Sequence, residues 1–173
     1  AQRLKREFWI AFAEKYPRKW LLYDTKIKDF TFKFYIDNKK AEVLLEIEPK
    51  DEEKRIIYYE KMESLKSIVL EDYLPEAVFE RNYHLDNGKI VSRVWVTLEQ
   101  VSVNNRATWE TIFDFFAEKM DAFERFFYEN EDYIKDLEVQ KGMLLARPIP
   151  EGGSPVFYRS CDVAMGTELV QGI

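Results

Sequence analysis

An alternation of apolar and polar residues over positions 29–37 constrains the fold of this chain more than any other feature. Every second residue of the segment is Phe or Ile, so these side chains lie on one face of a β-strand. Asn38-Lys39 then offers a turn, and positions 41–48 alternate again up to Pro49. Together the two segments predict a β-hairpin with one face in the core.

Helical spacing of apolar residues marks three other parts of the chain. The first helix runs from Leu4 and is ended by Pro17, which cannot continue it. A second helix follows Asp51, a suitable N-cap, and its buried stripe extends to Tyr73. A third, strongly aromatic helix follows Thr108, which we expect to cap it.

Further strands are predicted around two short patterns. The apolar run at positions 20–23 predicts a strand, and Asn87-Gly88 is typical of a tight hairpin turn between strands near 78–85 and 90–98. The resulting order is α-β-β-β-α-β-β-α. This order predicts an α+β fold in which a mixed sheet packs against three main helices.

The composition changes near position 138, after which five of the six glycines occur. We therefore place a single α+β domain at residues 1–137 and a Gly/Pro-rich tail at 138–173. The tail is either a native extension that docks Met143, Leu144 and Leu145 on the domain, or vector-derived sequence.

Composition also narrows the class of protein. Aromatic residues make up 16% of the 173 residues and charged residues 34%, which together are typical of a globular chain. No apolar run approaches the roughly 20 residues that cross a bilayer, so we expect no membrane partner. The only cysteine, Cys161, favours a reducing, cytoplasmic location, and the net charge of −6 argues against nonspecific nucleic-acid binding.

Four stretches of the chain resemble a bacterial domain-of-unknown-function family, number 4268. They are EFWIAFAEKYPRKW, KKAEVLLEIEPKDEEKRIIYYEKMESLKSIVLE, FERNYHLDNGKIVSRVWV and ATWETIFDFFAEKMDAFERFF, which span roughly residues 5–137. Members of that family resemble the PD-(D/E)XK restriction-endonuclease-like superfamily. The core order of that superfamily, α-β-β-β-α-β, agrees with the order predicted above.

The resemblance implies a candidate metal-dependent site. In such nucleases an Asp and a Glu-x-Lys triplet hold Mg²⁺ and position a water molecule. The corresponding metal ligands here would be Asp29, Glu46 and Glu48, and the catalytic residues Glu46, Glu48 and Lys50. Mg²⁺ is the cofactor of this hypothesis, and no cofactor is expected otherwise.

The predicted hairpin register bears on this site. Symmetric pairing about the turn places Thr31 opposite Glu46 and Asp29 opposite Glu48, with Lys33 on the same face. Pro49 interrupts the triplet, and the residue two positions after Glu46 is Glu48 rather than Lys. The alternative is that these acidic side chains simply form the solvated face of the hairpin.

A second candidate site is a binding surface at Arg93 and Trp95, to which Lys33 contributes. A guanidinium beside an aromatic ring can present a surface for nucleic acid or peptide. The alternative is that Arg93 pairs across the strands with Glu80 or stacks on Trp95. His84 is expected on the same face of its hairpin.

Two functions remain open. The first is a non-catalytic interaction or accessory domain that binds a protein, associates with itself or binds nucleic acid. The second is a Mg²⁺-dependent PD-(D/E)XK-type nuclease in restriction or phage defence. The imperfect triplet and the acidic chain favour the first.

Overall fold

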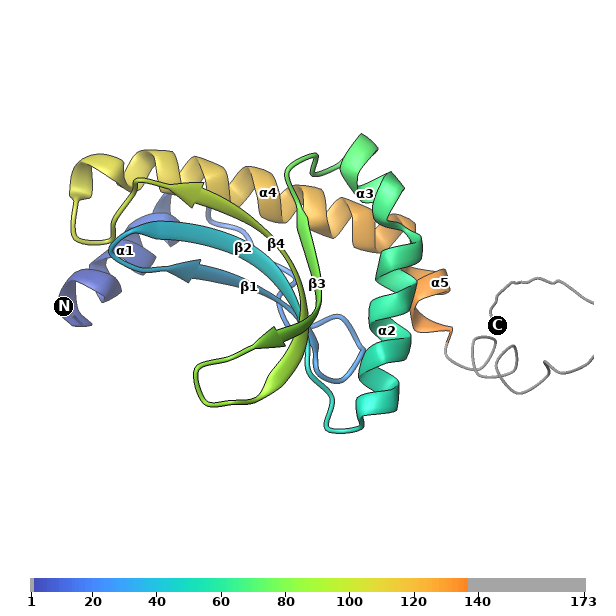
Figure 1. The fold of residues 1–173 in the computed structure, drawn as a ribbon. Coiled ribbons are helices and arrows are strands. Elements are labelled where there is room, and N and C mark those ends of the chain that lie inside the picture. Colours follow the sequence, from blue (N-terminus) through green and yellow to red (C-terminus); the bar gives the residue numbers. More distant parts are fainter. Residues whose placement is uncertain (1, 137–173) are drawn as a thin grey trace, which may run out of the picture. The chain divides into compact units, whose positions relative to one another are not determined.

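The expected hairpin forms the first half of a four-stranded sheet in the computed structural model, which describes residues 2–136 (Figure 1). β1 (Phe30–Ile36) pairs antiparallel with β2 (Lys40–Ile47). The register places Thr31 opposite Glu46, as predicted. Alternation and a short turn together fix such a register, because a one-residue slip would turn every apolar side chain outward.

The second half of the sheet is the hairpin of β3 (Val78–His84) and β4 (Ile90–Glu99). Its turn contains Gly88 at φ +87°, a conformation that glycine adopts without strain. The strand order is β1-β2-β4-β3, and every neighbouring pair is antiparallel. The prediction of a mixed sheet was wrong, because β4 inserts between β2 and β3 and separates the two strands that share a direction.

The strand predicted at positions 20–23 is absent. This segment precedes β1 as an irregular loop, and its one ladder-like bond within the described residues is from the N–H of Phe32 to the carbonyl of Leu22 at 3.0 Å. Leu22 has φ +49°, which turns the chain out of the extended conformation. Without this strand, the agreement with the α-β-β-β-α-β core order no longer holds.

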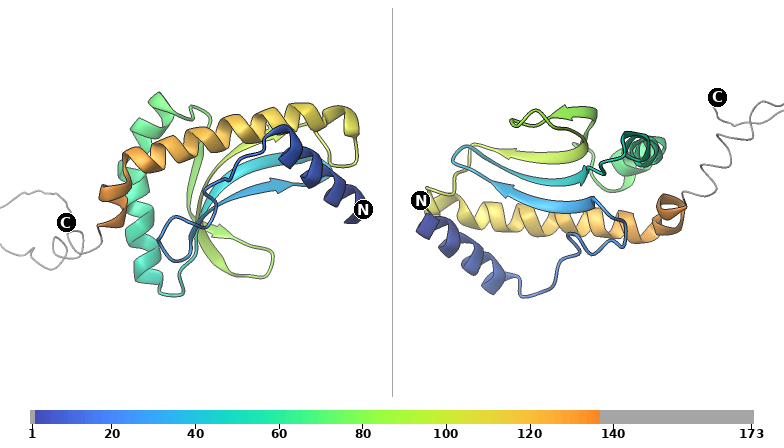
Figure 2. Two further views of the ribbon diagram at one scale, coloured as in Figure 1. Left: turned by 180° about the vertical axis from the view of Figure 1, so that it is seen from behind. Right: turned by 90° about the horizontal axis from the view of Figure 1, so that it is seen from below.

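Helices α1 (Gln2–Lys15) and α4 (Trp109–Glu129) cover one face of the sheet (Figure 2). Aromatic pairs make this contact: the ring centroids of Phe34 and Phe116 lie 4.8 Å apart, and those of Phe32 and Phe123 lie 5.4 Å apart. Much of the aromatic content is thus core material.

Helix α2 (Glu52–Ser64) packs on the same face, at the other end of the sheet, where the Tyr58 ring meets Phe30. The side chain of Asp51 caps it as predicted, accepting from the N–H of Glu53. The predicted single helix breaks at Leu65, and α3 (Lys66–Asp72) follows.

The remaining elements are the 3₁₀ turn η1 (Arg106–Thr108), which precedes α4, and α5 (Glu131–Lys135). Thr108 starts α4 but does not cap it with its side chain, which bonds the preceding loop instead. The chain divides into two units, 1–131 and 132–173. The predicted tail, including Met143, Leu144 and Leu145, lies outside the described residues, so the boundary at 137 stays a prediction. No helix among residues 2–136 is long and apolar enough to cross a membrane.

Candidate functional site

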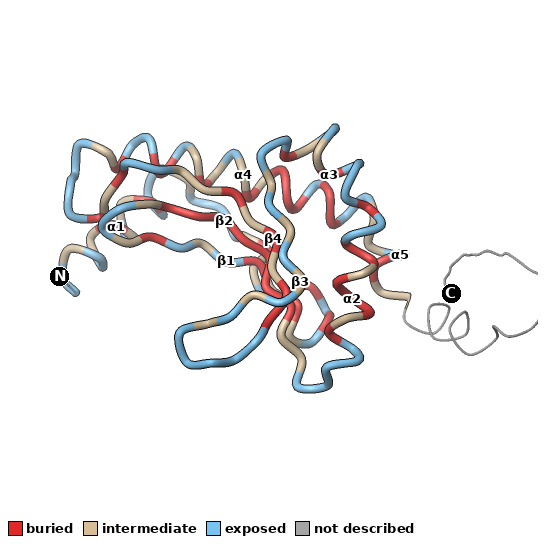
Figure 3. The backbone as a smooth tube through the Cα atoms, viewed as in Figure 1, coloured by how far each residue is buried: buried red, intermediate tan, exposed pale blue. Residues whose placement is uncertain are grey.

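Helices α1, α2 and α4 leave the opposite face of the sheet open, yet strand β2 is buried on both of its faces. Every residue of β2 from 41 to 47 is buried (Figure 3). On the open face, Glu42, Leu44 and Glu46 are only 6%, 3% and 3% exposed. Such positions are usually solvated on a one-sided sheet. Neighbouring long side chains and the tip of the β3–β4 hairpin therefore cover them.

Between these covering groups lies a polar pocket of about 360 Å³. Its walls come from β1, β2, β4 and the hairpin tip, and they include Lys33, Tyr35, Glu42, Glu46, Tyr83 and Arg93. The first and last strands in the chain, β1 and β4, thus contribute to the same pocket.

Glu46 is the centre of this pocket. Lys33 of β1 bonds one of its carboxylate oxygens, and Arg93 of β4 donates to the other, Nη2 to Oε2, at 2.9 Å. Arg93 lies directly opposite Glu46 in the ladder, and Lys33 lies diagonally from it across β1. Both carboxylate oxygens therefore accept from cations.

The electrostatic balance favours the charged forms of Glu46 and Lys33. Burial alone would raise the pKa of Glu46, but hydrogen bonds from Lys33 and Arg93 outweigh it and lower the pKa below its usual value. Burial likewise opposes the charge of Lys33, yet the contact with Glu46 raises the pKa of the lysine. The pairing thus offsets the desolvation that a buried carboxylate otherwise suffers.

Aromatic side chains hold Arg93 from the side. Its guanidinium carbon lies 4.1 Å from the centroid of the Tyr83 ring. The Tyr83 ring in turn meets Trp95 edge-on at 5.4 Å. The aromatic ring beside the Arg93 guanidinium is thus Tyr83 rather than the predicted Trp95, and the ion pair of Arg93 is with Glu46 rather than Glu80.

Tyr83 reaches this position because β3 contains a bulge. Glu80 pairs with Arg93, but the next paired residue is Tyr83, opposite Val91, so two residues of β3 oppose the single residue Ser92. The bulge moves Tyr83 onto the face of Arg93. His84, which was expected there, pairs with Ile90 instead and is exposed, and it lines the pocket from the hairpin tip.

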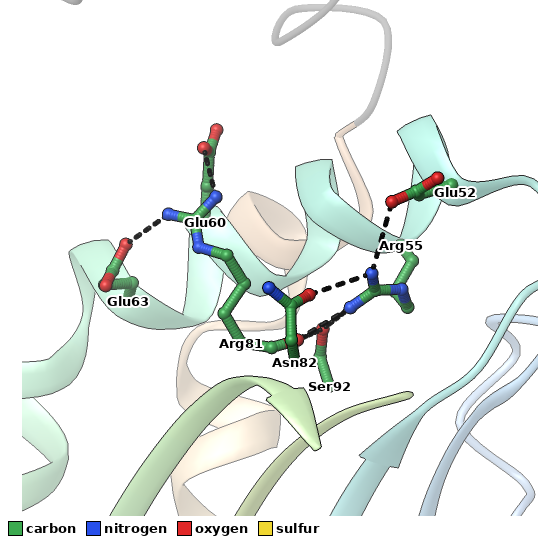
Figure 4. Close-up of polar contacts among 7 residues, drawn as sticks. All are labelled: Glu52, Arg55, Glu60, Glu63, Arg81, Asn82 and Ser92. Carbon is green, nitrogen blue, oxygen red and sulfur yellow. Dashed lines mark hydrogen bonds and ion pairs between the residues drawn. The ribbon is translucent and has the colours of Figure 1, made fainter. Parts of the chain in front are cut away.

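A buried arginine of α2 holds the bulge in place (Figure 4). Arg55 is 4% exposed, and its Nη1 donates to the carbonyl of Arg81 at 2.6 Å and to the hydroxyl of Ser92 at 2.7 Å. Its Nη2 donates to the side chain of Asn82 at 3.1 Å. Because a bulge frees backbone groups from the ladder, Arg55 supplies the donor that they lose.

The bulge is also tied to α2 from outside. The guanidinium of Arg81 contacts Glu60 at 3.2 Å and Glu63 at 3.3 Å, both on α2 (Figure 4). Its carbon lies 5.4 Å from the centroid of the Tyr59 ring. The helix on one face of the sheet thereby sets the position of the hairpin that covers the other face.

Two buried polar atoms beside Glu46 have no hydrogen-bond partner among the described residues. They are Oγ1 of Thr31 and Nε of Arg93. Both residues stand opposite Glu46, one on each neighbouring strand. Since buried polar groups are nearly always paired, the unpartnered Nε of Arg93, a residue that lines the pocket, indicates a place for a further polar group.

A second buried carboxylate lies nearby on β2. Glu42 contacts Nζ of Lys40 at 3.2 Å and accepts from the hydroxyl of Thr97 at 3.4 Å. Tyr35, on the rim, donates to Asp37 at 2.8 Å. The open face thus carries two partly neutralised acidic positions.

The other proposed metal and catalytic residues lie at the end of β2. Glu48 contacts Lys33 at 3.5 Å and Lys89 of the hairpin tip at 3.2 Å. Asp29 meets Glu48 through the backbone, its carbonyl accepting from the N–H of Glu48 at 2.8 Å. Lys50 lies beyond the strand and is exposed. Thus Glu46, Glu48 and Lys33 come together, while Lys50 stays outside the group.

Within residues 2–136, no group of three or more His, Cys, Asp or Glu side chains is arranged to hold a metal ion. The assignment of Asp29, Glu46 and Glu48 as metal ligands remains a prediction. Of the proposed binding residues, Lys33 and Arg93 line the pocket, and Trp95 supports it through Tyr83.

Sequence reasoning missed Tyr83 and Arg55. Regular alternation, which places His84 on the face of Arg93, puts Tyr83 on the other face, and the bulge contains no glycine to signal it. Arg55 lies in the charged start of α2, where an arginine usually faces solvent. Its place in the helical stripe with Tyr58 and Met62 was the available signal.

The fold and the site define a small α+β domain with helices on one face of an antiparallel sheet and a polar pocket on the other. The family model described as "Domain of unknown function (DUF4268)" matches residues 4–131, and the chain belongs to that family. No curated protein and no solved structure matches the chain.

Proposed function

We propose that this chain is a non-catalytic interaction domain of the bacterial cytoplasm that binds a partner protein through the pocket around Glu46. The observation that carries the proposal is the pair of unpartnered buried atoms, Arg93 Nε and Thr31 Oγ1, on either side of Glu46. Its single cysteine suits a reducing compartment.

The state of Glu46 supports binding rather than catalysis. A carboxylate that holds a metal or moves a proton needs an oxygen free for that task. Both oxygens of Glu46 are engaged by Lys33 and Arg93, and the lowered pKa keeps the group ionised at neutral pH. Its role is therefore to fix the two cations.

The unpartnered atoms indicate what the partner supplies. The Nε–H of Arg93 is a donor, so a carbonyl or carboxylate oxygen of the partner satisfies it, and the Thr31 hydroxyl can bond either a donor or an acceptor. The Tyr83 ring now covers the guanidinium, and the partner group displaces it on reaching Nε. Tyr35, 41% exposed on the rim, adds apolar contact area.

Site-specific photo-crosslinking in the native host tests this proposal. A photoreactive phenylalanine analogue at Tyr35 should cross-link to a defined partner protein. The same analogue at Tyr128, which is 57% exposed on α4, is the matched control and should not. Arg93→Lys in the Tyr35-labelled chain should abolish the product, because lysine keeps the charge but loses the Nε donor. Equal products from both positions, or a product that Arg93→Lys leaves unchanged, contradict the proposal.

A second candidate is the Mg²⁺-dependent nuclease, with a nuclease-like fold. It is favoured by the convergence of Glu46, Glu48 and Lys33 at one end of β2, with Lys33 rather than Lys50 in the place of the catalytic lysine. Single- and double-stranded DNA and RNA should be incubated with Mg²⁺ or Mn²⁺. Cleavage that is lost in Glu46→Ala would establish this candidate and overturn the first; no cleavage by either chain would eliminate it.

A further inference from the structure

The outer edge of β1, which borders no other strand of the sheet, is a surface separate from the pocket around Glu46. The hydrogen bonds at the two ends of the hairpin run from Asp37 N–H to the Lys40 carbonyl and from Glu48 N–H to the Asp29 carbonyl. In an antiparallel pair, backbone groups of alternate residues point to the same side. The odd-numbered residues of β1 therefore bond β2, and the even-numbered residues point their backbone groups away from the sheet.

Only the first part of this edge is covered. The carbonyl of Phe30 accepts from the Thr25 hydroxyl at 2.7 Å, and the N–H of Phe32 bonds the Leu22 carbonyl at 3.0 Å. Among residues 2–136, nothing bonds the outward backbone groups of Phe34. An open stretch of edge strand is a template on which another extended chain can pair.

An apolar pocket opens beside this stretch. It measures about 410 Å³ and lies between α1, the loop at positions 17–22 and β1. Its aromatic walls include Trp9, Phe12, Trp20 and Phe34. The Phe34 ring, whose own backbone is open, lies 5.3 Å from the Phe12 centroid and 5.6 Å from that of Trp20. A strand added at Phe34 would place a side chain at this pocket.

The rim of the pocket is basic. A neighbouring hollow on α1 shares Trp9 and includes Lys5 and Arg6, and Lys19 lines the pocket itself. Within the described residues none of these three cations forms an ion pair within 4.0 Å, although Asp24 lies in the electrostatic reach of Lys19, whereas Arg18 beside them is bound to Glu124 at 2.5 Å. Unpaired cations on both sides of an apolar pocket complement an acidic ligand.

We propose that the edge of β1 at Phe34 binds an extended, acidic segment of a partner protein by strand addition, with one bulky apolar side chain in the aromatic pocket. Main-chain hydrogen bonds to Phe34 supply affinity, and the pocket and cations select the side chains. A second copy is the less suited occupant, because its own β1 edge is flanked by the same cations, Lys5, Arg6 and Lys19, and like charges would meet. Charged side chains at a strand edge oppose edge-to-edge pairing.

Selection from a random peptide library displayed on phage tests the ligand chemistry, using the full chain as bait. Enriched peptides should carry acidic residues around a bulky apolar residue. A synthetic copy of the best peptide should bind with an affinity at least tenfold weaker for Ala13→Arg, which fills the pocket from an exposed helix position and should leave the fold intact. Enrichment of basic or featureless peptides, or no enrichment, overturns the proposal.

Two further measurements test the charge complementarity and the strand addition separately. Arg6→Glu should weaken the peptide severalfold, whereas Lys54→Glu, an equal charge change on the exposed start of α2, should not. Bound peptide should slow hydrogen exchange at the Phe34 amide. Unchanged exchange there, or equal effects of the two charge reversals, refutes strand addition at this edge.

Other occupants would be recognised in the same experiments. A concentration-dependent dimer in sedimentation that Ala13→Arg abolishes would assign the edge to a second copy. Tighter binding of a single-stranded oligonucleotide than of any selected peptide, with the same dependence on Ala13, would assign the pocket to nucleic acid. Either result overturns the peptide assignment. In the cross-linking experiment at Tyr35, the Arg93→Lys variant separates the two sites, because a strand bound at the β1 edge does not depend on Arg93.

Discussion

Replacement of Arg55 by methionine should release the bulge that positions Tyr83. Methionine keeps an apolar stem of comparable length, so the packing against α2 is largely retained. The change removes the two short bonds from Nη1 to the Arg81 carbonyl and the Ser92 hydroxyl.

The expected loss follows from those bonds. A hydrogen bond from a charged group contributes about 1.5 kcal/mol or more, so Arg55→Met should lower the free energy of unfolding by about 3 kcal/mol. The Arg81 carbonyl keeps its bond from Ser92 at 2.7 Å, which limits the penalty of leaving it buried. The contact with Glu52 at 3.7 Å adds little, because that carboxylate is exposed.

Urea denaturation followed by far-ultraviolet circular dichroism measures this loss. Glu52→Gln is the matched control and should change stability by less than about 0.5 kcal/mol. Near-ultraviolet dichroism should also change in Arg55→Met, because Tyr83 leaves the edge of Trp95. A loss below about 1 kcal/mol with an unchanged near-ultraviolet spectrum would show that Arg55 does not hold the bulge.

Three other perturbations test separate parts of the structure. Because the pKa of Glu46 is lowered in the folded state, its contribution to stability is present above the usual carboxyl value of 4.5 and is lost as the pH falls through the folded pKa. Urea denaturation across acidic pH should therefore show a steeper loss for the native chain than for Glu46→Gln, and parallel curves would contradict the ion-pair assignment. Gly88→Ala should lower the free energy of unfolding by about 1 kcal/mol in the same assay, because the new Cβ meets open space but φ is +87°. Gly88→Asn should lower it by less, and equal losses would contradict the backbone explanation. Glu124→Gln should lower the free energy of unfolding by about 2 kcal/mol, because buried Glu124 accepts from the Leu21 N–H at 2.7 Å and binds Arg18. An unchanged denaturation midpoint would show that these contacts of Glu124 do not stabilise the fold.

Local patterns predicted the parts of the fold that depend on local chemistry. The register that sets Thr31 opposite Glu46 followed from alternation and turn length, and Asp51 was recognisable as an N-cap. The loop at 20–23 was misread because an apolar run has the same composition in a strand and in a loop. Its conformation depends on Glu124, which is 103 residues from Leu21 in the chain.

Local sequence patterns could not predict the strand order or the assembled site. Glu46, Lys33 and Arg93 were each singled out from the sequence, but the ion pair to Arg93 requires β4 to lie beside β2. The position of β4 depends on the insertion of a whole hairpin, which no local pattern reports. For Tyr83, the alternation of β3 predicted the wrong face because of the bulge.

The bulge decides which side chains of β3 lie on the same face as Arg93. A chain one residue shorter at Arg81-Asn82 would form a regular ladder that keeps Tyr83 opposite Val91, whereas the full-length strand paired without its bulge would exchange the inward and outward side chains beyond that point. His84 would then take the place of Tyr83 beside Arg93. The identity of this site is thus encoded in a count of residues as much as in their kinds, because the bulge must absorb one extra residue between Glu80 and Tyr83 for Tyr83 to face Arg93.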